Sequence, residues 1–529
     1  MYTLCKLLYV TVFGLLSAAP PYLPLYYRNV LGFSSDQIGF AIAIAPFVQS
    51  ISCPVWTYFV DKHPRLHGAT MAFTSCLGGI AVMGIMGIGH YVQSSITADD
   101  DDEDTNNKRS IVIATCTFAL AFAFFTLPNT ALVDSAVMKI LGPNKILYGE
   151  QRLWGSVSTG LTILLVGILI SATDNLDMLF WVFAACTVGF MICSAITDVE
   201  EPAIPALDEE QQRLLDGNNM PPMVNTNSRH MHPLHNPVTL YQSLSRHDTD
   251  DDDDHLSYTT ALETYQQQRL LKLTTTTSIV SMARTLREEA NDALECSPSS
   301  FNNNNLGLAV SRVMSVEHTA GIMADDSDSV QVPSTSTFRS PRVFGYLITT
   351  LLFGVVLSII VNFLFLFLSD NLHMPASWIG WTGPLGGLTE LLAFFYSKQM
   401  TERWGVTKLV VLAHLVTIVR CLGYTWLVPD SVVSHVLALA LQTLHGIGFA
   451  IFWGTSVSEM DSFFPPEQRA VAQGVLGSLH QGLGTALGAL IGGYLDEYLG
   501  TIWMFRCAAA LCGVSILIFC ISRLPRFEN

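Results

Sequence analysis

Hydrophobic and polar residues follow one another along this chain in long blocks. Twelve mostly apolar stretches of about 20 residues are joined by polar connections. A stretch of that length crosses the hydrocarbon core of a bilayer as a helix, and open strands cannot satisfy their backbone in lipid. We therefore predict an all-α membrane protein with twelve transmembrane helices. The predicted spans are residues 4–27, 36–60, 68–92, 111–133, 153–172, 177–197, 344–368, 377–398, 406–428, 432–457, 469–494 and 499–522.

The twelve spans fall into two groups of six, separated by one long polar insert. This layout is the hydropathy pattern of a transporter built from two related six-helix bundles. We predict a first bundle over residues 1–197, a cytoplasmic central loop over 198–342 and a second bundle over 343–529.

The insert at 198–342 is rich in Ser, Thr, Asn, Asp and Gln and includes the acidic run Asp250–Asp254. Such a segment buries too little apolar surface to fold alone, so we predict a disordered acidic loop. Leucines at helical spacing over 257–294 predict a helix that lies on the membrane surface or against the bundles. The loop is either a plain tether or a regulatory segment, with kinase or other regulatory partners at Ser297 and Ser340, each followed by proline.

Composition supports the membrane class and excludes several others. Half of the residues are hydrophobic, 13% are charged, and the mean hydropathy is +0.39. The net charge of −17 comes mostly from the insert, so it indicates nothing about a solute and gives no reason to expect a nucleic-acid partner. The 11 cysteines show no metal-ligand spacing. No nucleophile elbow, H-E-x-x-H motif or P-loop occurs, so we predict neither an enzyme nor a cofactor.

Basic residues set the expected orientation. Lys and Arg gather in alternate connections and in the C-terminal tail, and such loops face the cytoplasm. Both termini and the insert are therefore predicted to be cytoplasmic, and the acidic loop 99–107 lies on the other side. The plasma membrane and internal membranes stay open as locations. The basic residues are Lys62, Arg65, Lys139, Lys145, Lys398, Arg403, Lys408, Arg469, Arg523 and Arg526.

Three consecutive spans between Trp378 and Asp461 each carry one ionisable residue near the middle: Glu390, Arg420 and His445. A charge at mid-membrane costs about 3 kcal/mol or more, so these residues should face one another or a wet cavity. An acid, a base and an imidazole at similar depth suit a proton-coupled carrier. The alternative is a buried salt bridge that fastens the eighth and ninth helices.

A motif in the first 65 residues points to a family. A proline-broken first helix is followed by a short polar loop, a proline-containing second span and a charged connection. The motif residues are Ser35–Gly39, Gln49, Pro54, Asp61, Lys62 and Arg65. This pattern resembles the major facilitator superfamily, in the branch of lactose permease and the bacterial nucleoside:proton symporters, and is closest to its MFS-1-like eukaryotic membrane proteins. The resemblance covers both predicted bundles and implies that Asp61, Lys62 and Arg65 form a cytoplasmic gate.

The resemblance also implies a solute site. It places an acid on the fourth helix and an arginine on the fifth, here Asp134 and Arg152. A carboxylate with a forked guanidinium suits polyhydroxyl ligands, although charges near helix ends also snorkel to water. Trp154 is predicted to stack on the ligand or to anchor the helix at the interface. The amides Gln442 and Gln481 are further candidate contacts.

Glu390, Arg420 and His445 match the acid, arginine and histidine of the lactose-permease pattern. That pattern has a second carboxylate one turn after the histidine, whereas this chain has Gly446 and Gly448. Either Glu390 takes the proton, or coupling is altered. The sequence therefore predicts a secondary transporter for a small polar organic solute, sugar- or nucleoside-like, driven by protons through alternating access. The alternative is a receptor or scaffold of the same fold that acts through its central loop.

Overall fold

The computed structural model describes residues 2–96, 104–141, 147–199, 340–464 and 469–524. These residues are helical with short connections. The N-terminal helices are α1 (Thr3–Ala18), α2 (Leu23–Asn29), α3 (Ser35–Lys62), η1 (Pro64–Leu66), α4 (His67–Ile96), α5 (Asp104–Phe125), α6 (Asn129–Leu141), α7 (Tyr148–Thr173) and α8 (Met178–Ile196). The C-terminal helices are α14 (Pro341–Leu366), η4 (Phe367–Asn371), α15 (Ala376–Gly380), α16 (Thr382–Trp404), α17 (Val406–Tyr424), α18 (Val432–Phe463), α19 (Arg469–Gly477), η6 (Ser478–Gly484), α20 (Thr485–Leu499) and α21 (Thr501–Ser522).

Ten helical stretches in the described part of the chain are long and apolar enough to cross a membrane. The other two predicted spans are helical as well. The span 377–398 is formed by α15 and α16, and 469–494 is formed by α19, η6 and α20, with a π-helical turn at η6. Large apolar side chains such as Phe40, Leu161 and Trp181 are exposed, as contact with lipid requires. The prediction of an all-helical, multi-pass membrane fold is confirmed.

Proline and capping residues explain where the first helices break. Pro20 and Pro21 separate α1 from α2, because proline lacks the backbone N–H that a helix interior needs. Ser34 and Gln37 form a capping box at the start of α3, and the Ser34 N–H donates to Gln37 Oε1 at 3.2 Å. The predicted break in the first span is therefore present.

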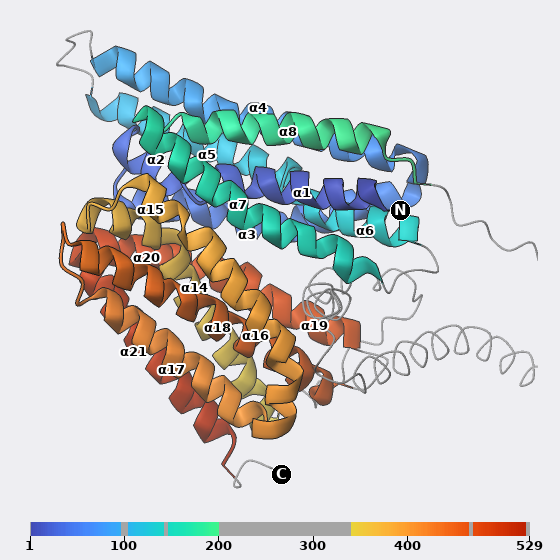
Figure 1. Cartoon of the computed structure of the whole chain (residues 1–529), viewed down its shortest axis with the longest axis vertical. Coiled ribbons are helices and arrows are strands. Elements are labelled where there is room, and N and C mark those ends of the chain that lie inside the picture. The colour runs from blue at the N-terminus through green and yellow to red at the C-terminus, as the bar shows by residue number, and fades with distance from the viewer. Residues whose placement is uncertain (1, 97–103, 142–146, 200–339, 465–468, 525–529) are drawn as a thin grey trace, which may run out of the picture. The chain divides into compact units, whose positions relative to one another are not determined.

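The described helices belong to one compact unit. Figure 1 shows α1–α8 (blue to green) gathered together and α14–α21 (yellow to red) gathered together. The predicted bundle boundaries at 197/198 and 342/343 stay predictions. The predicted helix at 257–294, Ser297 and most of the acidic loop 99–107 lie outside the described residues.

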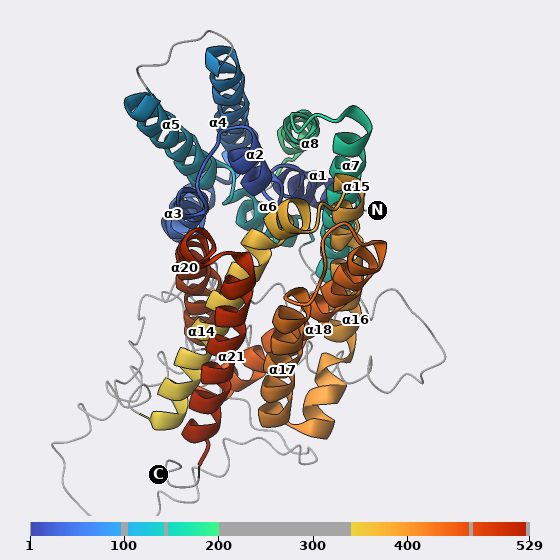
Figure 2. The same ribbon diagram turned by 90° about the vertical axis from the view of Figure 1, so that its left-hand side faces the viewer.

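The N-terminal and C-terminal helices meet through α3 with α20 and through α7 with α15 and α16 (Figure 2). Glycines make these contacts close. A Cβ on Gly39 would meet the carbonyl oxygen of Ala489 and lie 3.0 Å from Gly493 Cα. A Cβ on Gly167 would meet the carbonyl oxygen of Ala376. Such backbone contact is the usual role of small residues between membrane helices.

Candidate functional site

The first candidate site joins α6 to α7 through a buried ion pair. Arg152 Nη1 donates to Asp134 Oδ1 at 2.6 Å and to Oδ2 at 2.5 Å, and both side chains are buried. Tyr9, on α1, donates from its hydroxyl to Asp134 Oδ1 at 2.6 Å, and Arg152 Nη1 lies 3.3 Å from the Tyr148 hydroxyl. The two residues do not snorkel to water but hold three helices together.

This site retains an unused donor. Arg152 Nε is buried and makes no hydrogen bond among the described residues. Arg152 also lies 5.5 Å from the ring centre of Phe13. Tyr9 and Tyr148 were not among the sequence-based candidates. A tyrosine in an apolar span is equally common in the helix core and at the membrane surface, so its position in the sequence does not indicate a binding role. The arrangement offers a carboxylate, phenols and a guanidinium, the mixed donors and acceptors that hydroxyl groups bind.

Trp154 lies away from this pair. Its side chain is 44% exposed, and Lys6 Nζ lies 5.8 Å from its ring centre. Lys6 also pairs with Glu150 at 2.8 Å. Two residues along a helix point to different faces, so Trp154 and Arg152 cannot both face Asp134. The structure therefore does not bring Trp154 to the other proposed ligand contacts.

The second candidate site lies between α17 and α18 and is centred on Arg420. The guanidinium is 1% exposed. Its Nη2 donates to Gln442 Oε1 at 2.7 Å, its Nη1 lies 3.1 Å from His445 Nδ1, and its Nε donates to the Tyr424 hydroxyl at 3.2 Å. The structure thus brings together three of the predicted site residues, Arg420, His445 and Gln442, and adds Tyr424.

Glu390 reaches this region through its backbone. It lies on α16, is half-buried, and its backbone nitrogen faces Gly446 of α18, next to His445. A Cβ on Gly446 would meet that nitrogen and would lie 2.5 Å from the carbonyl oxygen of Gly386. Close packing of α16 on α18 therefore requires glycine at 446.

Gln481 lies in the π-helical segment η6 and is half-buried. Its neighbour His480 is 2% exposed, and both of its ring nitrogens lack a hydrogen-bond partner among the described residues. Aromatic rings surround the imidazole, with ring-centre distances from 5.2 to 6.2 Å. These rings are Phe353, Phe449, Phe452 and Trp453. No hydrogen bond joins Gln481 to the Arg420 cluster in the described structure.

Charge pairs cluster at the end of the helices where α1 begins, which we call the Lys6 end. Asp61 Oδ1 pairs with Lys139 Nζ at 2.7 Å and so ties α3 to α6. Lys62 and Arg65 are exposed. The three proposed gate residues are thus close in the chain, but Asp61 pairs with a basic residue of another helix.

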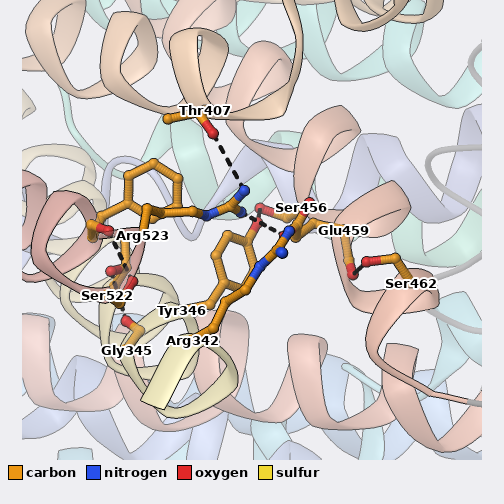
Figure 3. Close-up of polar contacts among 11 residues, drawn as sticks. Arg342, Gly345, Tyr346, Thr407, Ser456, Glu459, Ser462, Ser522 and Arg523 are labelled. Carbon is orange, nitrogen blue, oxygen red and sulfur yellow. Dashed lines mark hydrogen bonds and ion pairs between the residues drawn. The ribbon is translucent and has the colours of Figure 1, made fainter. Parts of the chain in front are cut away.

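A second network at this end was missed from the sequence. Glu459 of α18 accepts from Arg523 Nη2 at 2.5 Å and from Arg342 Nη2 at 3.2 Å (Figure 3). Arg523 also donates to Thr407 at 3.2 Å, and Tyr346 donates to Ser456 at 2.7 Å. The network therefore ties together the ends of α14, α17, α18 and α21. Glu459 looked like an ordinary charge at a helix end, because its partners are far away in sequence.

The opposite end, which we call the Arg28 end, has contacts of another kind. Arg28 lies 3.9 Å from Asp370 and 3.8 Å from Glu497. The Ser35 N–H donates to Glu497 Oε2 at 2.7 Å, and the Ser35 hydroxyl donates to Asp496 at 2.6 Å. These contacts join N-terminal to C-terminal helices. The ion pairs just described at the Lys6 end each stay within one group of helices.

Comparisons with known proteins give the family. The model of the MFS_1 like family matches residues 2–507. A protein of Escherichia coli (strain K12) that is named as a nucleoside transporter, YegT, is 26% identical over 118 residues, which are 22% of this chain and 28% of that protein. The human "Major facilitator superfamily domain-containing protein 6-like" is 28% identical over 182 residues, 34% of this chain and 30% of that protein. Each match spans less than a third of the relative's length.

A solved structure supports the fold. The crystal structure of the nucleoside transporter NupG superposes with a TM-score of 0.63 and covers 100% of both chains at 14% identity. At that identity the similarity concerns the fold. No group of His, Cys, Asp and Glu residues able to hold a metal ion occurs among the described residues.

Proposed function

Because this chain belongs to the MFS_1 like family, we propose that it is a secondary active transporter that moves a small polar organic solute together with protons. The observation that carries the proposal is the pair of buried charged clusters, one among the N-terminal helices and one among the C-terminal helices. Buried charges inside membrane helices are costly and are kept for ion or solute pathways. Asp134 and Arg152 form one cluster, and Arg420 with His445 and Gln442 forms the other.

The pattern of contacts supports alternating access. At the Arg28 end, the glycines of α3 and α7 pack on the C-terminal helices, and Arg28 and Ser35 reach the acids there. At the Lys6 end, the pairs around Asp61 and Glu459 stay within their own group of helices. This conformation is closed at the Arg28 end. With the Lys6 end in the cytoplasm, we assign this conformation to the inward-facing state of the proposed cycle.

Glu390 is the proposed proton-coupling residue. It lies on α16, in backbone contact with α18 at Gly446, directly beside His445. His445 in turn contacts Arg420. A change in the charge of Glu390 is proposed to act on the second cluster through this contact of α16 with α18. Asp61, Lys62 and Arg65 remain the proposed cytoplasmic gate, with Lys139 as the partner of Asp61.

Nucleoside-like and sugar-like solutes are the proposed class. The family and the relative named as a nucleoside transporter support it. The Asp134–Arg152 pair, with Tyr9 and Tyr148, supplies donors and acceptors for ribose or sugar hydroxyls. Gln442 and Gln481 are proposed further contacts, whereas the exposed position of Trp154 favours an interfacial anchor.

Uptake by proteoliposomes tests this function. Purified protein is reconstituted, and the entry of radiolabelled uridine, adenosine, glucose and lactose is measured with a proton gradient directed inward. We expect at least one solute to accumulate. Asp134→Asn should lose most of that uptake, because it removes the negative charge that balances Arg152 and replaces one of the two acceptor oxygens by an NH₂ donor. Equal entry of all four solutes into protein-containing and protein-free vesicles would contradict the proposal.

A further inference from the structure

We infer that Arg420, His445 and Gln442 form a binding site for an oxyanion, a carboxylate or phosphate group carried by the solute. The inference rests on the proposed transport function and narrows the small polar organic solutes to those that carry a carboxylate or phosphate group.

Arg420 carries a buried positive charge that no carboxylate of the described residues balances. Arg420 is 1% exposed, yet no carboxylate lies within ion-pair distance of it in the part of the chain that the structure describes. The contrast is Arg152, which holds Asp134 at 2.5 Å. A buried charge without a counter-charge is strongly unfavourable. We therefore infer that the negative charge that balances Arg420 comes from an anionic group of the bound solute.

Several N–H groups of Arg420, His445 and Gln442 remain without an acceptor within the cluster. A guanidinium has five N–H groups, and the three contacts here use one each on Nε, Nη1 and Nη2. One N–H on each of Nη1 and Nη2 is left. Because Arg420 only donates, His445 Nδ1 must accept, so the ring proton lies on Nε2. Gln442 accepts through Oε1, which leaves its amide NH₂ as a donor.

The acceptors of the cluster are already engaged. Gln442 Oε1 takes the bond from Arg420, with the Tyr424 hydroxyl 3.5 Å away, and His445 Nδ1 takes another. What remains are donors from three side chains. A neutral hydroxyl of a sugar needs both donors and acceptors, whereas an oxyanion needs donors alone. The cluster therefore matches a carboxylate or phosphate better than a hydroxyl.

Ring contacts hold the donors in place. The His445 ring stacks on Phe449 with a centre distance of 6.3 Å and an angle of 16° between planes. The Arg420 guanidinium lies 5.5 Å from the ring centre of Tyr424. His445 is half-buried and is the most exposed member of the cluster. Side chains held in this way lose little freedom when a ligand binds.

Thermal unfolding with simple oxyanions tests the inference. The purified full-length protein is heated in sodium chloride, sodium acetate or sodium phosphate at equal ionic strength. We expect the Tm to rise by a few degrees and to saturate in acetate, in phosphate or in both, because a ligand of the native state stabilises it. A response to acetate alone assigns a carboxylate, and a response to phosphate alone assigns a phosphate group.

Variants separate the site from general salt effects, which also stabilise proteins. Arg420→Gln should lose the saturable part of the shift. Arg506→Gln, an exposed arginine on α21, should keep it. His445→Phe preserves the stack on Phe449, removes the Nε2 donor and should weaken the response about tenfold, the effect of losing about 1.4 kcal/mol. His445→Phe tests the site by itself if Arg420→Gln does not fold.

The inference is overturned if Arg420→Gln and His445→Phe respond to acetate and phosphate as the wild type does, or if the wild type shows no saturable shift. Its failure differs from failure of the transport proposal. Uptake of a neutral nucleoside that is unchanged in Arg420→Gln refutes the oxyanion site and leaves transport standing. An oxyanion shift that depends on Arg420, without uptake of any anionic or neutral solute, refutes transport and leaves the site standing.

Discussion

Two arginines in this protein are buried, but only one of them, Arg152, has a carboxylate as its partner. Arg152 has its counter-charge, Asp134, at 2.5 Å, whereas Arg420 is held by the neutral groups Gln442, His445 and Tyr424. Removing one partner of a buried pair strands the other charge. Removing an arginine that has no carboxylate beside it leaves no buried negative charge without a partner. Substitution of the two arginines should therefore lower the free energy of unfolding by different amounts.

We expect Arg152→Gln to destabilise the protein by about 3–5 kcal/mol, because Asp134 is left charged and buried. Arg420→Gln should lower the Tm much less. Both are measured by thermal unfolding of the purified protein. Adding Asp134→Asn to Arg152→Gln should restore most of the loss. Equal losses in the two single variants, or no recovery in the double variant, would show that the two arginines are held in the same way.

Residues of this kind differ in how far the sequence reveals them. Arg420, His445 and Glu390 are visible because an ionisable residue in an apolar stretch needs an explanation. Tyr9 and Glu459 are not, because a phenol in a membrane helix and an acid at a helix end are both ordinary. Their roles depend on partners 125 and 64 residues away, Asp134 and Arg523. Only the packing of the helices brings these pairs together.

At the scale of helices, glycines decide how closely neighbours approach. Gly446 lets α18 lie against α16, and Gly167 lets α7 lie against α15. The sequence shows these glycines but not which helix each one meets. The π-helical turn η6 was also not predicted, since the span 469–494 reads as one glycine-rich helix. π-turns often occur at functional positions, and this one carries the buried His480.

Gly167→Val should open the contact at the Arg28 end. A Cβ at this position would lie 2.9 Å from Gly380 Cα, and overpacking costs about 1–3 kcal/mol, or about 5- to 150-fold in an equilibrium. Ser171 Oγ accepts from the Ser377 N–H at 2.8 Å, so cysteines at these two positions should cross-link. We expect the valine variant to slow this cross-linking about tenfold.

The matched control is Gly513→Val on α21, where a Cβ would meet nothing within 4 Å. It should leave the cross-linking rate unchanged. Cross-linking that is equally fast in Gly167→Val would mean that the α7–α15 contact does not depend on the glycine.

For the whole molecule, the length and spacing of the apolar stretches predicted the helical membrane fold, because lipid allows few other backbone structures. The orientation of the termini and the bundle boundaries stay predictions. So does the choice between a transporter and a scaffold that acts through residues 198–342. The missing carboxylate one turn after His445 still favours the scaffold, because the glycine that packs on α16 is Gly446, the residue next to His445. The two readings differ in one property, the flux of solute.

The most direct test of proton-coupled transport is accumulation in proteoliposomes with and without an inward proton gradient, in wild type and in Glu390→Gln. We expect the wild type to accumulate its solute only with the gradient. Glu390→Gln should lose that accumulation while retaining exchange of labelled for unlabelled solute, and Glu402→Gln, at the exposed end of the same helix, should behave as wild type. Gradient-driven accumulation that is unchanged in Glu390→Gln would contradict the account.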